Sequence, residues 1–279
     1  MIKIPLSKIF LAIVSIALFI SCDNEYKKTT ASTPVKDSSI VTLKNQASIA
    51  KISEPDRQVI DDFYEAISAN NTQKVKKMLT TSFPASFLPK NKITPLQAMI
   101  WAGDNLELAK ALIEGGANPK HNDNIAILTA AEYKRYEILK YLVKKGSDIK
   151  HTGAFNQAGF YQFYDGAKYL LLHGANQTEG DTRGKLWIFH QAVRLSDYEV
   201  LNALQMSKDD WNYHDYKGQT ALIIAVKNND VELVKFLIGK GVDKKKPETF
   251  DSGDDISFGQ SPLQIAKENQ ASEIITLLQ

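Results

Sequence analysis

Polar and apolar positions in residues 219–243 follow the period of two short helices joined by a turn. The apolar residues of each predicted helix share one face at spacings of three and four: Leu222, Ala225 and Val226 in the first helix, and Val234, Leu237 and Ile238 in the second. Asp230 can cap the start of the second helix, and Gly241 suits the left-handed residue that ends it. Because isolated helices of this length are marginal in water, the unit should stack on similar units.

Weaker copies of this helix-turn-helix unit recur along the chain at intervals of roughly 30 residues. The positions equivalent to Thr220 are Asp61, Thr94, Ile125, Gly153, Trp187 and Ser261. In most copies an alanine follows five residues later, where a small side chain lets the paired helices approach closely. A period of this length predicts a solenoid in which each unit buries its apolar face on its neighbours.

Short motifs in these units resemble the ankyrin repeat family. They are Thr94-Pro95-Leu96-Gln97 with Gly116-Ala117-Asn118, Gly174-Ala175-Asn176, residues 215–222, and Ser261-Pro262-Leu263-Gln264-Ile265-Ala266. The resemblance implies an all-α ankyrin-repeat solenoid of about seven helix-turn-helix units over residues 56–279, with short β-hairpin-like fingers. It also implies that His190, at the fourth position of its unit, forms hydrogen bonds between neighbouring units.

Several units depart from this pattern. The first and fifth carry Ser82 and Lys208 where other units have the terminal glycine, so their second helices should end differently. The fourth unit, residues 153–176, has lost most of the first-helix pattern and is assigned mainly from residues 167–172. Residues 244–259 extend the connection to the last unit and are expected to form a longer, mobile finger.

The first 22 residues resemble a bacterial lipoprotein signal peptide. Lys3 and Lys8 precede an apolar run, residues 9–20, which is shorter than the about 20 apolar residues of a membrane-spanning helix. Ser21 and Cys22 follow, although Phe19 stands where the family pattern prefers leucine. The resemblance implies cleavage before Cys22 and lipidation of Cys22 as the first mature residue. A plain secretory signal, or an anchor helix with an incidental cysteine, is the alternative.

The polar composition of residues 23–55 predicts a flexible tether between a lipid on Cys22 and the repeats. We therefore expect a lipid-anchored protein of the bacterial cell envelope, at the outer membrane or the periplasmic side of a membrane. The residues after Cys22 leave the destination open. Asp23 resembles an inner-membrane retention signal, whereas Asp23-Asn24-Glu25 resembles a surface-export signal.

Charge and motifs argue against several functional classes. Without Lys3 and Lys8 the chain has 32 basic and 32 acidic residues, so it lacks the excess positive charge of a nucleic-acid-binding protein. Phosphate-binding, nucleophile-elbow and metalloprotease motifs are absent from the sequence, and Cys22 is its only cysteine. His121, Asp123 and His151 match no recognised metal-ligand spacing. We expect no catalytic residues, metal, cofactor or small-molecule substrate.

The candidate binding residues lie at the ends of the first helices, at positions that face the concave side of ankyrin-like stacks. They are Trp101, Tyr133, Phe160, Tyr161, Arg194 and Lys227. The finger Tyr213-His214-Asp215-Tyr216 is a second candidate, contributing Tyr213, His214 and Tyr216. Trp, Tyr and Arg often dominate the energetics of protein interfaces. Alternatively, Phe160 and Tyr161 fill the core of a degenerate fourth unit.

These observations favour a protein-protein interaction module, tethered to a membrane, whose concave face binds an unidentified protein partner. One version is an immunity or inhibitor protein that covers a site on its partner. The alternatives are a structural spacer or envelope component without a tight partner and, less favoured, an enzyme with an unrecognised site.

Overall fold

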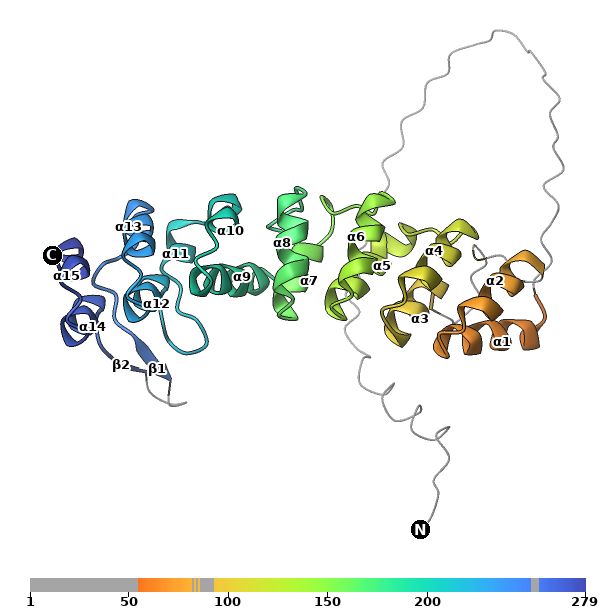
Figure 1. Ribbon diagram of the computed structural model, residues 1–279, viewed down its shortest axis with the longest axis horizontal. Coiled ribbons are helices and arrows are strands. Elements are labelled where there is room, and N and C mark those ends of the chain that lie inside the picture. The colour runs from red at the N-terminus through yellow and green to blue at the C-terminus, as the bar shows by residue number, and fades with distance from the viewer. Residues whose placement is uncertain (1–54, 82, 84, 86–92, 252–255) are drawn as a thin grey trace, which may run out of the picture. The chain divides into compact units, whose positions relative to one another are not determined.

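The computed structural model describes residues 55–81, 83, 85, 93–251 and 256–279, all of which belong to one compact unit extending over residues 53–279 (Figure 1). The predicted signal peptide and, apart from Pro55, the predicted tether lie outside the described residues. Within the described part, no helix has the length and apolar character needed to cross a membrane.

Fourteen of the helices in the described residues form seven consecutive pairs, which confirms the predicted solenoid of seven units. The first helices are α1 (Arg57–Ser68), α3 (Pro95–Ala102), α5 (His121–Glu132), α7 (Ala154–Phe160), α9 (Arg183–Arg194), α12 (Ala221–Lys227) and α14 (Pro262–Glu268). The second helices are α2 (Thr72–Thr81), α4 (Leu106–Glu114), α6 (Tyr136–Lys144), α8 (Tyr164–Leu172), α10 (Tyr198–Ala203), α13 (Val231–Gly239) and α15 (Ser272–Leu278).

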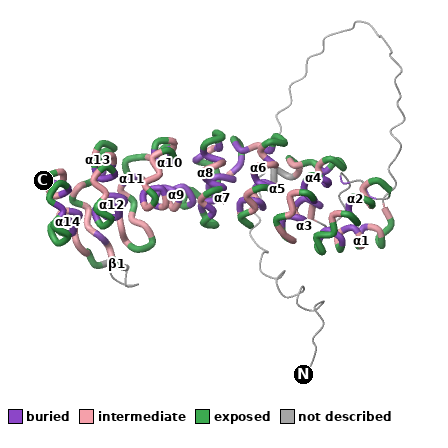
Figure 2. The backbone as a smooth tube through the Cα atoms, viewed as in Figure 1, coloured by how far each residue is buried: buried purple, intermediate pink, exposed green. Residues whose placement is uncertain are grey.

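The helices form two layers with the core between them. Each first helix packs on the first helix of the next unit, from α1 through α14, and the second helices from α2 to α10 pack in the same way (Figure 1). Buried positions recur in every pair (Figure 2). A chain of units that bury their apolar faces on one another is the arrangement predicted from the repeat period.

Side chains and glycines define the ends of the helices as the sequence predicts. Thr94, Thr220 and Ser261 each accept a hydrogen bond from the backbone N–H three residues later, at the starts of α3, α12 and α14. Four second helices are followed by a glycine with positive φ, at Gly116, Gly146, Gly174 and Gly241. The close fit between paired helices thus follows from local sequence signals.

The departing units are resolved individually. The fourth unit is complete, with α7 and α8 both formed and Phe155 fully buried between the layers. In the fifth, α10 ends at Ala203 and a short helix, α11 (Lys208–Trp211), follows, so this unit does end differently, as predicted. Ser82 of the first unit lies outside the described residues.

The extension after the sixth unit contains a β-hairpin-like finger. Strands β1 (Thr249–Asp251) and β2 (Ile256–Phe258) pair antiparallel, with Phe250 opposite Ser257. The backbone N–H of Thr249 also donates to the carbonyl of Gly218, at 3.0 Å, which ties this hairpin to the preceding finger.

Units four and five approach each other closely through backbone. A Cβ atom on Gly184 would lie only 2.0 Å from the carbonyl oxygen of Asn156, so α7 and α9 can pack this closely only with glycine there. The buried side chain of Asn156 donates to the carbonyls of Gln177 (3.1 Å) and Glu179 (2.7 Å) and accepts from the N–H of Lys185 (3.0 Å). This contact fixes the C-terminal end of α7 relative to the start of α9.

Candidate binding surface

Four large aromatic side chains are exposed at the ends of successive first helices. Trp101 of α3, Tyr133 after α5, and Phe160 and Tyr161 at the end of α7 are between 37% and 47% exposed. The alternative that Phe160 and Tyr161 fill the core of the fourth unit is therefore wrong. Phe155 and Ala158 of α7 occupy that core, and the helix turns Phe160 away from it.

The four aromatic residues contact each other or their neighbours in adjacent units. The ring centroids of Trp101 and Tyr133 lie 6.4 Å apart, and those of Phe160 and Tyr161 lie 5.4 Å apart at an interplanar angle of 71°. Desolvation and the nearby Glu132 carboxylate raise the pKa of Tyr161, so the third and fourth units meet here. We call Trp101, Tyr133, Phe160 and Tyr161 the aromatic ridge.

Arg183 connects the aromatic ridge to the finger of the sixth unit. Its guanidinium carbon lies 5.3 Å from the ring centroid of Phe160, within cation-π range. Its Nε donates to Asp181, which lies beside it on the surface. Arg183 also lines a small hollow together with Tyr213 and Tyr216. The two candidate regions that the sequence presents separately are therefore neighbours.

The predicted binding residues Arg194 and Lys227 each form an ion pair with a buried carboxylate of the following finger. Arg194 pairs with Asp215, whose side chain is 3% exposed, and Lys227 pairs with Glu248. In both cases the cation at the end of a first helix neutralises an acid at the base of the next unit. These contacts serve packing between units, and a role for either cation in partner binding stays a prediction.

The finger at residues 212–218 is held by two histidines. His190 is buried, and its Nδ1 and Nε2 lie 2.9 Å and 3.1 Å from the carbonyls of Leu186 and Tyr213, which confirms its predicted role between units. Burial lowers the pKa of His190 below its usual value. His214 lies half-buried with its Nε2 2.8 Å from the carbonyl of Pro247.

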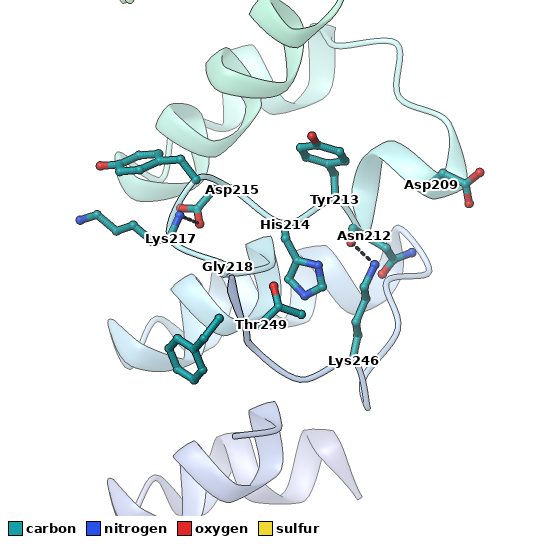
Figure 3. A pocket seen from close by; sticks show the side chains of 11 residues that line it. Asp209, Asn212, Tyr213, His214, Asp215, Lys217, Gly218, Lys246 and Thr249 are labelled. Carbon is teal, nitrogen blue, oxygen red and sulfur yellow. Dashed lines mark hydrogen bonds between the residues drawn. The ribbon is translucent and has the colours of Figure 1, made fainter. Parts of the chain in front are cut away.

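Tyr213 and Tyr216 project from this finger into solvent, and Tyr216 is 78% exposed. The finger separates two hollows. The larger, about 860 Å³, lies toward the β-hairpin, and its lining includes His214, Thr249 and Lys246 (Figure 3). There Lys246 Nζ donates to the carbonyl of Asn212, at 2.7 Å.

The smaller hollow, about 250 Å³, lies between the finger and α9, and we call it the α9 groove. Its lining residues are Arg183, Leu186, Trp187, His190, Arg194, Tyr213, His214, Asp215 and Tyr216. It adjoins the aromatic ridge through Arg183.

Some exposed apolar residues were not among the predicted site residues. Trp187 and Leu186 line the α9 groove, and Phe250 and Phe258 are exposed on the β-hairpin. The two phenylalanines stand in an otherwise polar extension, a signal visible in the sequence. Trp187 aligns with the start of a repeat, where an interior position is the ordinary expectation, so only the structure reveals its exposure to the groove.

The model of the family described as ankyrin repeats (3 copies) matches residues 63–153 and 189–279, more than half of the chain. This chain belongs to the ankyrin repeat family. Ankyrin repeats are protein-protein interaction modules, and the mostly helical fold described above agrees with this assignment.

Similar proteins come from diverse sources. An ankyrin repeat protein of fowlpox virus is 34% identical over 113 residues, covering 40% of this chain and 24% of that protein. An L-asparaginase of Dirofilaria immitis is 22% identical over 247 residues, covering 85% of this chain and 38% of that protein. The ankyrin repeat domain of human ASB11 has a TM-score of 0.49 at 16% identity, with 78% of this chain and 97% of that chain covered. The chain thus spans well under two thirds of the first two relatives.

The described surface offers contacts for binding. The described residues contain no cluster of three or more His, Cys, Asp or Glu side chains that would hold a metal ion. The catalytic activity in the name of the asparaginase relative belongs to that protein, and the shared region at 22% identity does not establish catalysis in this ankyrin repeat chain. What the ridge and finger provide is exposed aromatic surface beside paired charges.

Proposed function

We propose that this ankyrin repeat chain binds another protein through one continuous surface, formed by the aromatic ridge together with Tyr213 and Tyr216. The observation that carries the proposal is the exposure of large aromatic side chains at equivalent positions of three successive units. The contact of Arg183 with Phe160 supports continuity between ridge and finger. Contiguous exposed apolar surface of this kind marks interaction sites.

The chemistry of this surface fits a protein partner. Aromatic rings bury a large area at a small cost in side-chain entropy, and central aromatic anchors commonly lose 2 kcal/mol or more of binding free energy when truncated, roughly 30-fold in affinity. The nearby charges of Arg194 and Lys227 are already neutralised within the chain. We therefore expect affinity to depend mainly on the rings and only weakly on ionic strength.

The test replaces both rings at one end of the ridge. The variant Trp101→Ala with Tyr133→Ala should lose partner capture while its thermal unfolding midpoint stays unchanged, because both side chains are exposed. Leu172→Ala provides the control, since Leu172 is comparably exposed on a second helix and should not affect capture. Undiminished capture by the double variant would refute the ridge as the binding surface.

We further propose that the protein is anchored by a lipid on Cys22 in a bacterial cell envelope. The support is the sequence of residues 1–22, with its basic start, short apolar run and single cysteine. One lipid chain alone binds membranes only marginally, so stable anchoring would need more than one acyl chain. Mass spectrometry of the mature chain should find acylated Cys22 at its N-terminus. An uncleaved chain, or an unmodified mature Cys22, would refute this anchor.

An immunity or inhibitor role is a more specific form of the same proposal, in which the aromatic ridge covers the working site of the partner. It predicts that the partner loses activity on binding and regains it with the Trp101→Ala, Tyr133→Ala variant. Stoichiometric binding without any change in the partner's activity would favour a scaffold role.

A further inference from the structure

The α9 groove has a chemical character that distinguishes it from the rest of the surface. Its apolar walls are Leu186 and Trp187 of α9, both half-buried, and the exposed rings of Tyr213 and Tyr216 on the finger. The indole of Trp187 packs against the core on one side and lines the groove on the other. The groove is therefore open on its outer side and firmly supported beneath.

The polar side chains at the base of the groove already have partners. Both ring nitrogens of His190 lie within hydrogen-bond distance of backbone carbonyls, and Nε2 of His214 faces the carbonyl of Pro247. Asp215 accepts from the N–H groups of Lys217 (2.8 Å) and Gln219 (2.9 Å). A guest would thus find few hydrogen-bonding groups at the base that are free to receive it.

The charges around the groove are also balanced in pairs. Arg194 pairs with Asp215 at one side, and Arg183 pairs with Asp181 at the rim. A charged guest would have to leave water without gaining a free counter-charge, which is unfavourable. An apolar guest loses nothing in this way and covers the rings of Trp187 and Tyr213.

Building on the proposed function, we infer that the α9 groove receives one uncharged, apolar side chain, aromatic or large aliphatic, from the protein partner. The hydroxyl groups of Tyr213 and Tyr216 form no hydrogen bond within the described part of the chain, so they are available at the rim to the backbone of the inserted segment. The partner then contacts the aromatic ridge over a broad area and is anchored in the α9 groove by a single residue.

Three tryptophans in the chain make this inference directly measurable. Trp187 lines the groove, Trp101 stands on the ridge and Trp211 is buried in the core. In NMR spectra of the full chain labelled with nitrogen-15, each indole N–H gives one signal, which a single Trp→Phe substitution assigns. The probes are N-acetyl-phenylalaninamide, N-acetyl-aspartic acid amide and N-acetyl-lysinamide, added separately.

The phenylalanine probe should shift the Trp187 signal saturably, with a dissociation constant on the order of 1 mM for a fragment of this size, and leave the Trp211 signal unmoved. The aspartate and lysine probes should bind at least about tenfold more weakly, because neither finds a counter-charge. Equal shifts with all three probes, or no saturable Trp187 shift with the phenylalanine probe, would overturn the inference.

Two variants at one position separate the wall of the groove from its fold. Tyr213→Phe keeps the ring and should retain the affinity for the phenylalanine probe, whereas Tyr213→Ala should weaken it about tenfold. Full affinity in Tyr213→Ala would contradict the assigned wall.

Trp101→Ala should leave the titration of Trp187 unchanged, since Trp101 lies on the ridge outside the groove. If the groove fails these tests while the Trp101→Ala, Tyr133→Ala variant still abolishes partner capture, the anchor is refuted and the proposed function stands. If the groove binds the probe while that variant captures the partner normally, the ridge assignment is the one refuted.

Discussion

Asp215→Ala removes the acid that joins the finger of the sixth unit to the first helix of the fifth. In the wild type this carboxylate pairs with Arg194 and accepts from the N–H groups of Lys217 and Gln219. The acid is 3% exposed and Arg194 is 23% exposed, so the pair is largely withdrawn from water. The substitution leaves Arg194 without its partner and two N–H groups without their acceptor.

The expected loss can be estimated from this geometry. Removing one partner of a buried ion pair costs about 3–5 kcal/mol, and the partial exposure of Arg194 favours the lower end, about 3 kcal/mol. For an array of this length, that corresponds to a fall of roughly 6–12 °C in the unfolding midpoint. Thermal unfolding monitored by circular dichroism and by tryptophan fluorescence measures this fall, and Trp211 reports on the affected region.

Asp181→Ala is the matched control, because it removes the acid from a second Arg–Asp pair. The side chains of Arg183 and Asp181 are 72% and 38% exposed, so water already screens their interaction. Its unfolding midpoint should match that of the wild type. Equal losses in the two variants would refute the argument that burial determines the strength of these pairs. In a double-mutant cycle, Arg194→Ala and Asp215→Ala should be non-additive by more than about 1 kcal/mol.

Three further predictions concern the packing of the units. Gly184→Ala should lower the free energy of unfolding by about 3 kcal/mol, because its Cβ would lie 2.0 Å from the Asn156 carbonyl oxygen, whereas Gly239→Ala, with open space around its Cβ, should change it by no more than about 1 kcal/mol in urea titrations. Asn156→Ala should cost about 2–4 kcal/mol in the same assay by leaving buried backbone groups unpaired, and a loss below 1 kcal/mol would contradict this. Since burial lowers the pKa of His190, the unfolded chain binds that proton more readily, so the contribution is complete above about pH 6.5 and is lost as pH falls further; His190→Gln should make unfolding less pH-dependent between about pH 5 and 7, and an unchanged slope would count against it.

The fold was predictable because its signals are local and repeated. Helix starts at Thr94, Thr220 and Ser261 carry the capping side chain that the structure uses, and the terminal glycines lie at left-handed positions. The fifth unit was less accessible, since aligning Lys208 with the terminal glycine conceals a new helix that begins beside it. Ser207 and Asp210 form a capping box there, a signal present in the sequence but outside the repeat pattern.

The candidate surface was predictable only in part. Helix periodicity placed Trp101 and Tyr133 on an outward face correctly, but it could not decide between exposure and burial for Phe160 in a unit without consensus. That outcome depends on contacts distant in sequence, including the contact of Asn156 with residues 177–185, which fixes α7 against α9. The pairing of Arg194 with Asp215 likewise depends on the path of the next finger.

The central claim is that the aromatic ridge and the finger form one surface for one partner. Photo-cross-linking tests it most directly, with p-benzoylphenylalanine placed separately at Tyr161, at Tyr216 and at the exposed control Leu172. The account predicts that the first two positions yield adducts with the same protein and that Leu172 yields none. Adducts with different proteins at Tyr161 and Tyr216, or equal cross-linking at Leu172, would contradict it.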